Sequence, residues 1–322
     1  MNDSAVPDET TVSAVVARAN RAPSLHNSQP WQWRWNGARL ALAVDAERLL
    51  PATDAFNRQG IIGCGAVLHH AVAAWNATWW RPRLERFPRP SDRTHLASLE
   101  FHGRHAPSDT DFELAAAIDT RYSDRAPYGP TQRWPDLAPV LTEVCRQHDT
   151  RLVPIDDRTR ATLGKISWSA SASRRRDPHY QSELAWWLGG AGPYAGVPAS
   201  ALPPREDPVR VPANREFLTG TADQGAEHHD QARIVALVSH DDTVESLLAC
   251  GEALSAVLLE CTKYGLSTCV MSHLTEMPAT RARVIEAMGE SHPQIFVRLG
   301  RATAPKPPRT PRRPVDDVLI IG

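Results

Sequence analysis

Hydrophobic and polar positions alternate along the chain in ways that predict helices and strands in turn. Apolar residues spaced three to four positions apart predict an amphipathic helix over residues 11–22. Tryptophans at every second position of 31–35, followed by Asn36-Gly37 and a second alternation over 40–44, are typical of a β-hairpin with a type I′ turn. The N-terminal part of the chain is therefore expected to begin with a helix, a short loop and a hairpin.

Two longer apolar segments predict buried central helices. The first covers about 55–76 after Asp54, and the second runs from Asp242 to Gly265. Each contains a Cys-Gly pair within a similar apolar context, at 64–65 and at 250–251, a shift of 250 − 64 = 186 residues. Because glycine lets two helices approach closely, the repeat predicts an internal duplication whose two central helices pack together.

The remaining pattern predicts a mixture of helices and strands. Strands are expected near residues 79–87, 96–102, 151–155, 232–238, 266–271, 294–299 and 318–321. Helices are expected near residues 135–148, 158–175, 179–188 and 279–288. Residues 189–231 show no sustained period, and residues 304–314 form a proline-rich arm.

Composition narrows the function classes without choosing one. With 322 residues, 42% of them hydrophobic, the chain can bury a large core, and its net charge of −1 gives no general attraction to nucleic acid or to an anionic membrane. The acidic N-terminus has no apolar signal segment, and the five cysteines show no paired spacing. We therefore expect a cytoplasmic protein with reduced thiols, without a membrane or nucleic-acid partner and without a metal site.

The candidate chemistry lies between Arg21 and Trp35. Ser24, His26, Asn27 and Gln29 offer hydroxyl, imidazole and amide groups that both donate and accept hydrogen bonds. Such a loop, bracketed by prolines, suits the pyrimidine edge of a flavin, which alternates acceptors with an N–H donor. An ordinary surface turn has the same composition, and on composition alone the two interpretations are about equally supported.

A family resemblance favours the flavin site. Residues 23–31, PSLHNSQPW, resemble the P-S-x-x-N-x-Q-P-W signature of the FMN-dependent nitroreductase superfamily. Residues 121–125, RYSDR, are similar to the family's R-x-S-x-R/K phosphate motif, which implies phosphate contacts from Arg121, Tyr122, Ser123 and Arg125. Taken without the resemblance, an R-x-S-x-R run in an arginine-rich chain is more often a solvated turn.

The order of the two motifs differs from that of an ordinary family member. There, one subunit carries both motifs, and the flavin mononucleotide (FMN) lies between two subunits. Here the amide loop of the first half has no arginine pair before it, since residues 1–20 contain only Arg18, and the arginine motif at 121–125 in the second half is not followed by an amide loop. The resemblance therefore implies a single-chain pseudo-dimer that assembles one complete FMN site.

Two further segments are similar to family elements. Residues 265–273 resemble the G-x-x-x-x-P-I-x-G turn beside the flavin ring, which implies contacts from Val270, Met271, Ser272 and His273. Val270 stands where the family has proline, and His273 where it has glycine. The closing R-x-P-x-x-x-V motif resembles residues 312–318 and implies phosphate pairing by Arg312 or Arg313; Arg21, at the start of the loop, completes the candidate set.

The resemblance is closest to the Acg-like branch of actinobacterial NAD(P)H nitroreductases, which is associated with hypoxia and dormancy. It implies an α+β fold, a nitroreductase-like α/β/α sandwich duplicated within one chain, with mainly antiparallel sheets. We expect an N-terminal half at 1–112, a C-terminal half at 113–322, and a monomer.

Two functions follow from the resemblance. The first is an oxidoreductase that passes hydride from NAD(P)H through FMN to a nitroaromatic, quinone or similar acceptor. The second is an FMN-sequestering or storage protein with little or no turnover.

Residues 189–231 fall outside the resemblance. They are too long for a routine connection and contain scattered apolar residues, so they are not simply disordered in composition. The apolar positions are Tyr194, Val197, Leu202, Val209, Val211, Phe217 and Leu218. We expect this segment to fold back as a lid over the flavin, with a mobile surface loop as the alternative.

Overall fold

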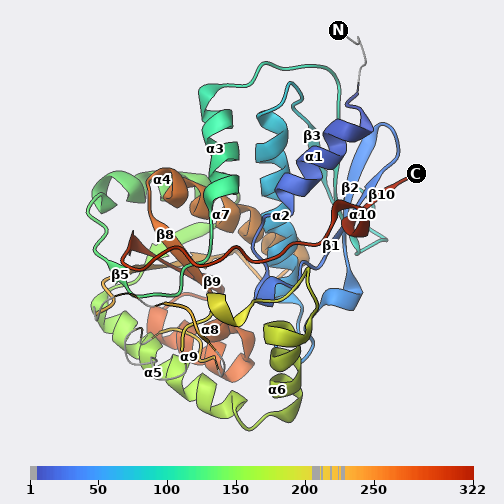
Figure 1. The fold of residues 1–322 in the computed structure, drawn as a ribbon. Coiled ribbons are helices and arrows are strands. Elements are labelled where there is room, and N and C mark those ends of the chain that lie inside the picture. Colours follow the sequence, from blue (N-terminus) through green and yellow to red (C-terminus); the bar gives the residue numbers. More distant parts are fainter. Residues whose placement is uncertain (1–5, 205–210, 212, 218–219, 224, 226–228) are drawn as a thin grey trace.

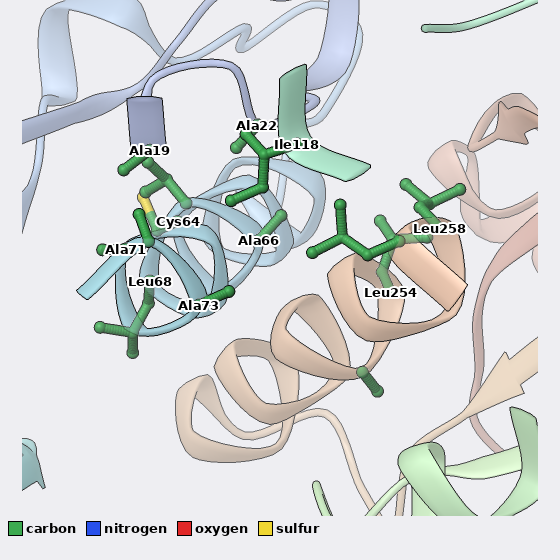
Figure 2. Close-up of a cluster of buried hydrophobic side chains, with 14 of the residues drawn as sticks. Ala19, Ala22, Cys64, Ala66, Leu68, Ala71, Ala73, Ile118, Leu254 and Leu258 are labelled. Carbon is green, nitrogen blue, oxygen red and sulfur yellow. The ribbon is translucent and has the colours of Figure 1, made fainter. Parts of the chain in front are cut away.

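Two long helices cross at the centre of the molecule (Figure 1). The computed structural model describes residues 6–204, 211, 213–217, 220–223, 225 and 229–322. Helix α2 (Arg58–Asn76) and helix α7 (Val244–Lys263) are buried along most of their length. Figure 2 shows the apolar side chains around them, including Leu68 on α2 and Leu254 and Leu258 on α7.

Gly65 and Gly251 make the close crossing of α2 and α7 possible. A Cβ atom added to Gly65 would lie 2.0 Å from the carbonyl oxygen of Leu248, and one added to Gly251 would lie 2.1 Å from that of Ile62. Such distances are far below van der Waals contact, so a larger residue at either glycine would force the helices apart. The contact predicted from the repeated Cys-Gly pairs is confirmed.

One five-stranded sheet packs on the α2 side and runs in the order β10-β1-β2-β4-β3. Its strands are β1 (Trp31–Trp35), β2 (Arg39–Val44), β3 (Arg83–Arg86), β4 (His95–Glu100) and β10 (Leu319–Ile321). The β1–β2 hairpin pairs Trp31 with Val44 and Trp35 with Leu40. All three tryptophans of β1 are buried, which explains their alternation in the sequence.

The second sheet runs in the order β5-β9-β7-β6, and β8 also pairs with β9. Its strands are β5 (Tyr128–Gly129), β6 (Arg151–Pro154), β7 (Arg233–Val238), β8 (Ser267–Met271) and β9 (Pro293–Ala302). These pairs are antiparallel. The predicted mixed α and β class with mainly antiparallel sheets is confirmed.

Further helices flank the central pair and the sheets (Figure 1). They are α1 (Glu9–Ala19), α3 (Asp109–Thr120), α4 (Trp134–Arg146), α5 (Asp157–Arg174), α6 (Pro178–Ala185), α8 (His273–Glu276), α9 (Pro278–Met288) and α10 (Val315–Val318). Among the described residues, no helix has the length and hydropathy required to cross a membrane. The five cysteines are buried and unpaired.

The C-terminal arm connects the two sheets. After β9 it crosses the molecule and ends in β10, which pairs in parallel with β1 (Figure 1). The end of the chain therefore completes the sheet begun near its start. The expected boundary between residues 112 and 113 assigns β10 to the C-terminal half, although β10 belongs to the first sheet.

The hairpin turn is not of the predicted type I′, because only Gly37 has a positive φ, of 85°, whereas that turn needs two such residues. Helix α2 begins at Arg58 rather than directly after Asp54, although the Asp54 carboxylate accepts a hydrogen bond from the first-turn amide of Gly60 at 3.0 Å. Helix α7 begins at Val244 with Thr243 as its N-cap, and Asp242 instead binds Arg281 at 2.6 Å.

Candidate functional site

Two adjoining hollows lie where the loop after α1, the segment after α3 and the end of β8 meet. The larger has about 710 Å³ of free space, including its open mouth. It is lined by Pro23, Ser24, Leu25, His26, Gln59, Ile62, Gly63, Ser123, Arg125, Asn214, Arg215, Phe217, Leu254, Cys269, Val270, Met271, Ser272, His273 and Ile295. A hollow that combines apolar walls with a few polar and charged groups is typical of ligand sites.

The smaller hollow, which we call the arginine hollow, has about 580 Å³ of free space. It is lined by Arg21, Pro23, Ser24, His26, Asn27, Arg121, Tyr122, Ser123, Arg125, Val197, Ala201, Pro307, Pro308, Arg309, Thr310 and Arg312. Five residues line both hollows: Pro23, Ser24, His26, Ser123 and Arg125. The two spaces therefore form one elongated site.

Charge distinguishes the arginine hollow from the rest of the surface. Among the described residues, its lining contains five arginines and no carboxylate. Burial and, to a lesser extent, the nearby charge of Arg21 together lower the pKa of Arg121 to about 10. Buried nitrogens of both side chains, Nε of Arg21 and Nε and Nη1 of Arg121, have no hydrogen-bond partner among the described residues. Burying like charges without partners is costly, so this cluster is suited to hold an anion.

Arg312 joins the cluster from the C-terminal arm. Its guanidinium donates to the carbonyl oxygens of Asn20 at 2.7 Å and Arg21 at 3.0 Å, at the C-terminal end of α1. Burial lowers its pKa well below the usual value, and Arg21 and Arg121 add to the shift. The cation is thus held in place by the negative end of a helix dipole while it faces the arginine hollow.

The loop at 24–29 has an unusual backbone. His26, Asn27 and Gln29 have φ values of 49°, 57° and 53°, in the left-handed region that non-glycine residues rarely adopt. The Ser24 hydroxyl accepts from the amide of Gln29 at 2.9 Å, which helps to fix this conformation. Strain of this kind persists only where surrounding contacts enforce it, and it is concentrated at functional sites.

The two amides of the loop bind protein rather than facing open space. Asn27 Nδ2 donates to the carbonyl oxygens of Gly196 and Pro311, both at 2.9 Å. Gln29 Nε2 donates to the carbonyl of Tyr194 at 2.9 Å, and its Oε1 accepts from the amide of Arg313 at 2.9 Å. The loop therefore fastens both the 189–231 segment and the C-terminal arm.

The segment after α3 is joined to the start of β8. Ser123 forms a parallel bridge with Thr268, and the amide of Asp124 donates to the Thr268 carbonyl at 3.0 Å. The hydroxyl groups of Tyr122 and Ser267 lie 3.1 Å apart. This join places the 121–125 motif at the junction of the two hollows and the 270–273 turn along the larger one.

His26 lines both hollows and is buried. Burial holds its pKa well below the ordinary value, with further lowering by Arg215 and Arg125, so the ring is neutral at pH 7. Its Nε2 atom has no hydrogen-bond partner among the described residues. A buried, unpartnered ring nitrogen on the wall of a hollow indicates a place for a ligand atom.

Described parts of the 189–231 segment line the two hollows. Asn214, Arg215 and Phe217 line the larger hollow, and Val197 and Ala201 line the arginine hollow. Arg125 donates to the carbonyl of Ala201 at 3.1 Å and lies over the ring of Phe217. Two of the apolar positions expected in this segment, Val209 and Leu218, lie outside the described residues.

Most of the expected site residues meet at these hollows. The arginine hollow gathers Arg21, Asn27, Arg121, Tyr122 and Arg312, and the larger hollow gathers Val270, Met271, Ser272 and His273; Ser24, His26, Ser123 and Arg125 line both. Gln29 and Arg313 line neither. The Arg313 side chain instead binds the carbonyl of Trp31 and the carboxylate of Asp45, both at 3.2 Å.

Sequence reasoning missed Arg309, Gln59 and Arg215. Arg309 stands in the proline-rich arm, and its positive charge among prolines was the signal that could have identified it. Gln59 precedes the repeated motif on α2, and its polarity within an apolar helix was a signal that was not used. Arg215 lies in an unpatterned segment and gave none.

No family model matches the chain. The Acg protein of Mycobacterium tuberculosis (strain H37Rv), named "Putative NAD(P)H nitroreductase acg", is 38% identical over 100% of this chain and 98% of its own length. The chain belongs to the nitroreductase superfamily, in the branch of Acg. A second relative from the same strain, "Putative NAD(P)H nitroreductase Rv3131", is 36% identical over 97% of this chain and 92% of its own.

Solved nitroreductase structures are more distant from this Acg-like chain. The protein from Anabaena variabilis described as "a putative nitroreductase" covers 92% of this chain and 90% of its own, with a TM-score of 0.45 and 12% identity. The FMN-dependent nitroreductase NfnB from Mycobacterium smegmatis, solved in complex with NADPH, covers 65% of this chain and 97% of its own, with a TM-score of 0.42 and 14% identity.

Proposed function

We propose that this Acg-like protein is an FMN-binding oxidoreductase that takes hydride from NAD(P)H and passes electrons to a small acceptor. The observation that carries the proposal is the arginine hollow, where five arginines gather and where the described part of the chain supplies neither a carboxylate nor partners for the buried guanidinium nitrogens. FMN carries a phosphate dianion, which matches this charge, and a planar ring, which fits the partly apolar larger hollow.

The residues divide by position along the elongated site. Arg121, Arg125, Arg309 and Ser123 would hold the phosphate, while Ser24, His26 and residues 270–273 would surround the ring. When bound, FMN supplies the hydride chemistry, and the protein supplies position and electrostatics. The neutral imidazoles of His26 and His273 and the cations of Arg125 and Arg215 would lie beside the ring. The apolar residues of the lining would exclude water.

We also propose that the chain is a duplicated pseudo-dimer, with halves at about 1–112 and 113–322, that binds one FMN as a monomer. Two features support this: the helix pair crossing at Gly65 and Gly251, 186 residues apart, and the arm that adds β10 to the first sheet. The halves supply complementary motifs, since the loop at 23–31 comes from one and the arginines at 121–125 from the other.

The experiment that tests the enzyme proposal is anaerobic stopped-flow mixing of the FMN-loaded protein with NADPH and, separately, with NADH. Bleaching of the flavin absorbance, followed by recovery on adding a quinone or nitroaromatic, supports the oxidoreductase. Dithionite provides the control, because it bleaches accessible flavin without needing a nucleotide site. If dithionite bleaches the flavin but neither NADPH nor NADH does, the oxidoreductase proposal is contradicted.

That last outcome would favour the second candidate, an FMN-storing protein with little turnover. The observation in its favour is that Asn214, Arg215 and Phe217 lie against the larger hollow, where they would act as a lid over the flavin. Replacing residues 189–231 with a short Gly-Ser linker should then speed reduction by NADPH. An unchanged rate with FMN still bound contradicts the lid.

A further inference from the structure

The His273 ring is held in a defined orientation beside the larger hollow. Its Nε2 atom lies 2.8 Å from the hydroxyl oxygen of Ser167, which in turn lies 3.1 Å from the carbonyl oxygen of Asn214. Within the described part of the chain, Ser167 is the hydrogen-bond partner recorded for this ring. The histidine stands at the end of the turn, where the family motif has glycine.

The two distances fix which nitrogen carries the proton. A carbonyl oxygen can only accept, so the single hydroxyl hydrogen of Ser167 goes to Asn214. The Ser167 oxygen must then accept from Nε2–H of His273. Burial, reinforced by Arg215, holds the pKa of His273 well below the ordinary value, so the ring is neutral. In a neutral ring with hydrogen on Nε2, Nδ1 carries a lone pair.

The other groups around the larger hollow make this lone pair distinctive. Arg125 and Arg215 are pure donors, and no carboxylate among the described residues lines the hollow. Apart from hydroxyl, amide and main-chain oxygens, the acceptors available to a ligand N–H group on these walls are the neutral rings of His26 and His273, and the tautomer of His273 is set by Ser167. An amide-type N–H is present both on the imide of a flavin ring and on the carboxamide of a reduced nicotinamide.

We propose that Nδ1 of His273 accepts a hydrogen bond from an amide-type N–H of the planar ligand in the larger hollow, and that Ser167 is the positioning residue that keeps it an acceptor. The inference rests on the proposed function, because it presumes a flavin or nicotinamide ring in this site. It also links recognition of the ligand to the 189–231 segment, which contains Asn214. If Asn214 moved away, the Ser167 hydroxyl would be free to donate to Nε2, and Nδ1 would become the donor.

Four variants test the proposal. Ser167→Ala releases the ring, His273→Gln retains a polar atom near the Nε2 position, and His273→Asn retains one near the Nδ1 position. Ser173→Ala, an exposed serine on the same helix α5, is the matched control. For each variant, the affinity of the apoprotein for FMN and of the FMN-loaded protein for the non-reducing analogue tetrahydro-NADPH is measured by titration.

One neutral hydrogen bond contributes modestly to binding, so Ser167→Ala and His273→Gln should each lower the affinity for one of the two ligands by roughly fivefold to tenfold. Ser173→Ala should stay within about twofold of the unsubstituted protein, and His273→Asn, which keeps an acceptor near the Nδ1 position, should lose less affinity than His273→Gln. A loss confined to FMN assigns the contact to the flavin imide, and a loss confined to the analogue assigns it to the carboxamide. Unchanged affinities for both ligands in Ser167→Ala and His273→Gln overturn the inference.

A direct measurement keeps the test independent of how the variants fold. The ¹⁵N shifts of the His273 ring in the unsubstituted, FMN-loaded protein report its tautomer. Hydrogen on Nε2 and a lone pair on Nδ1 support the proposal, and the opposite tautomer overturns it. Failure of the unsubstituted protein to bind FMN is a separate result, which overturns the proposed function together with the inference.

Discussion

The side-chain amide of Asn27 donates a 2.9 Å hydrogen bond to the carbonyl oxygen of Pro311, 284 positions further along the chain. The same nitrogen donates to Gly196 at 2.9 Å. One short loop thus holds both the C-terminal arm and the covering segment against the site. Because residues of the arm and of the segment line the arginine hollow, a ligand there is enclosed by elements that depend on this amide.

Asn27→Asp should therefore release bound FMN faster. The substitution keeps the size of the side chain but replaces a donor with an acceptor that faces two carbonyl oxygens. Loss of two hydrogen bonds to a buried amide should raise the dissociation rate by roughly tenfold or more. The rate is measured by dilution of the FMN complex into excess apoflavodoxin-type scavenger, with Ser173→Ala as the control; an unchanged rate would show that the amide does not retain the ligand.

Gly65→Ala should destabilise the fold, because its Cβ would lie 2.0 Å from the Leu248 carbonyl oxygen and 2.8 Å from the Cα of Gly251. Overpacking of this kind costs about 1–3 kcal/mol in unfolding free energy, and backbone atoms cannot move aside cheaply. Gly189→Ala is the control, since nothing lies within 4 Å of its added Cβ. Equal denaturation midpoints for the two variants would contradict the tight crossing.

Asp54 predicts a specific pH dependence of stability. Burial raises the pKa of its carboxyl group from 3.8 to about 6. Since the folded value exceeds the unfolded one, the protonated form stabilises the fold at low pH, and this contribution is lost as pH rises from about 4 to 6. A shift of this size corresponds to about 3 kcal/mol.

Asp54→Asn keeps an oxygen that can accept from Gly60 but cannot ionise. The difference in unfolding free energy between this variant and the unsubstituted protein should grow in favour of the variant across pH 4–6, as measured by urea denaturation. A difference that does not vary with pH would mean that Asp54 is ionised in the folded protein at low cost.

FMN titration should reach one equivalent per chain, with the chain monomeric by light scattering. The reason is that the amide loop occurs once in the sequence and that, of the two R-x-S-x-R runs at 89–93 and 121–125, it is the second that lines the hollows beside this loop. Absorbance of the reconstituted protein gives the ratio. Two flavins per chain would contradict the complementary loss of motifs between the two halves.

Much of the architecture could be predicted because its cause is local. The alternation of Trp31, Trp33 and Trp35 predicts a strand with one buried face, and the apolar run around Gly65 predicts a central helix. Helix α1 begins at Glu9, earlier than the residue 11 that the apolar period predicts. The reason is that Asp8 caps it, since the Asp8 carboxylate accepts a hydrogen bond from the amide of Thr11 at 2.8 Å.

The candidate site was less predictable where its contacts span the chain. The loop composition identified Asn27 and Gln29 as hydrogen-bonding groups, but their partners, Pro311 and Tyr194 among them, lie far away in sequence. Similarly, Arg309 enters the arginine hollow only because the arm crosses the molecule. Such placements depend on tertiary packing, which no periodicity of the sequence encodes.

The central claim is that the arginine hollow binds the phosphate of FMN, and the comparison of FMN with riboflavin on Arg125→Ala tests it most directly. Charge-assisted hydrogen bonds to phosphate contribute about 1.5–3 kcal/mol each, so the variant should bind FMN at least roughly tenfold more weakly, while its affinity for riboflavin, which lacks the phosphate, should change little. Arg158→Ala, at an exposed arginine of α5, should leave both affinities unchanged. An equal loss for FMN and riboflavin would mean that Arg125 is structural and would contradict the assignment of the phosphate to this hollow.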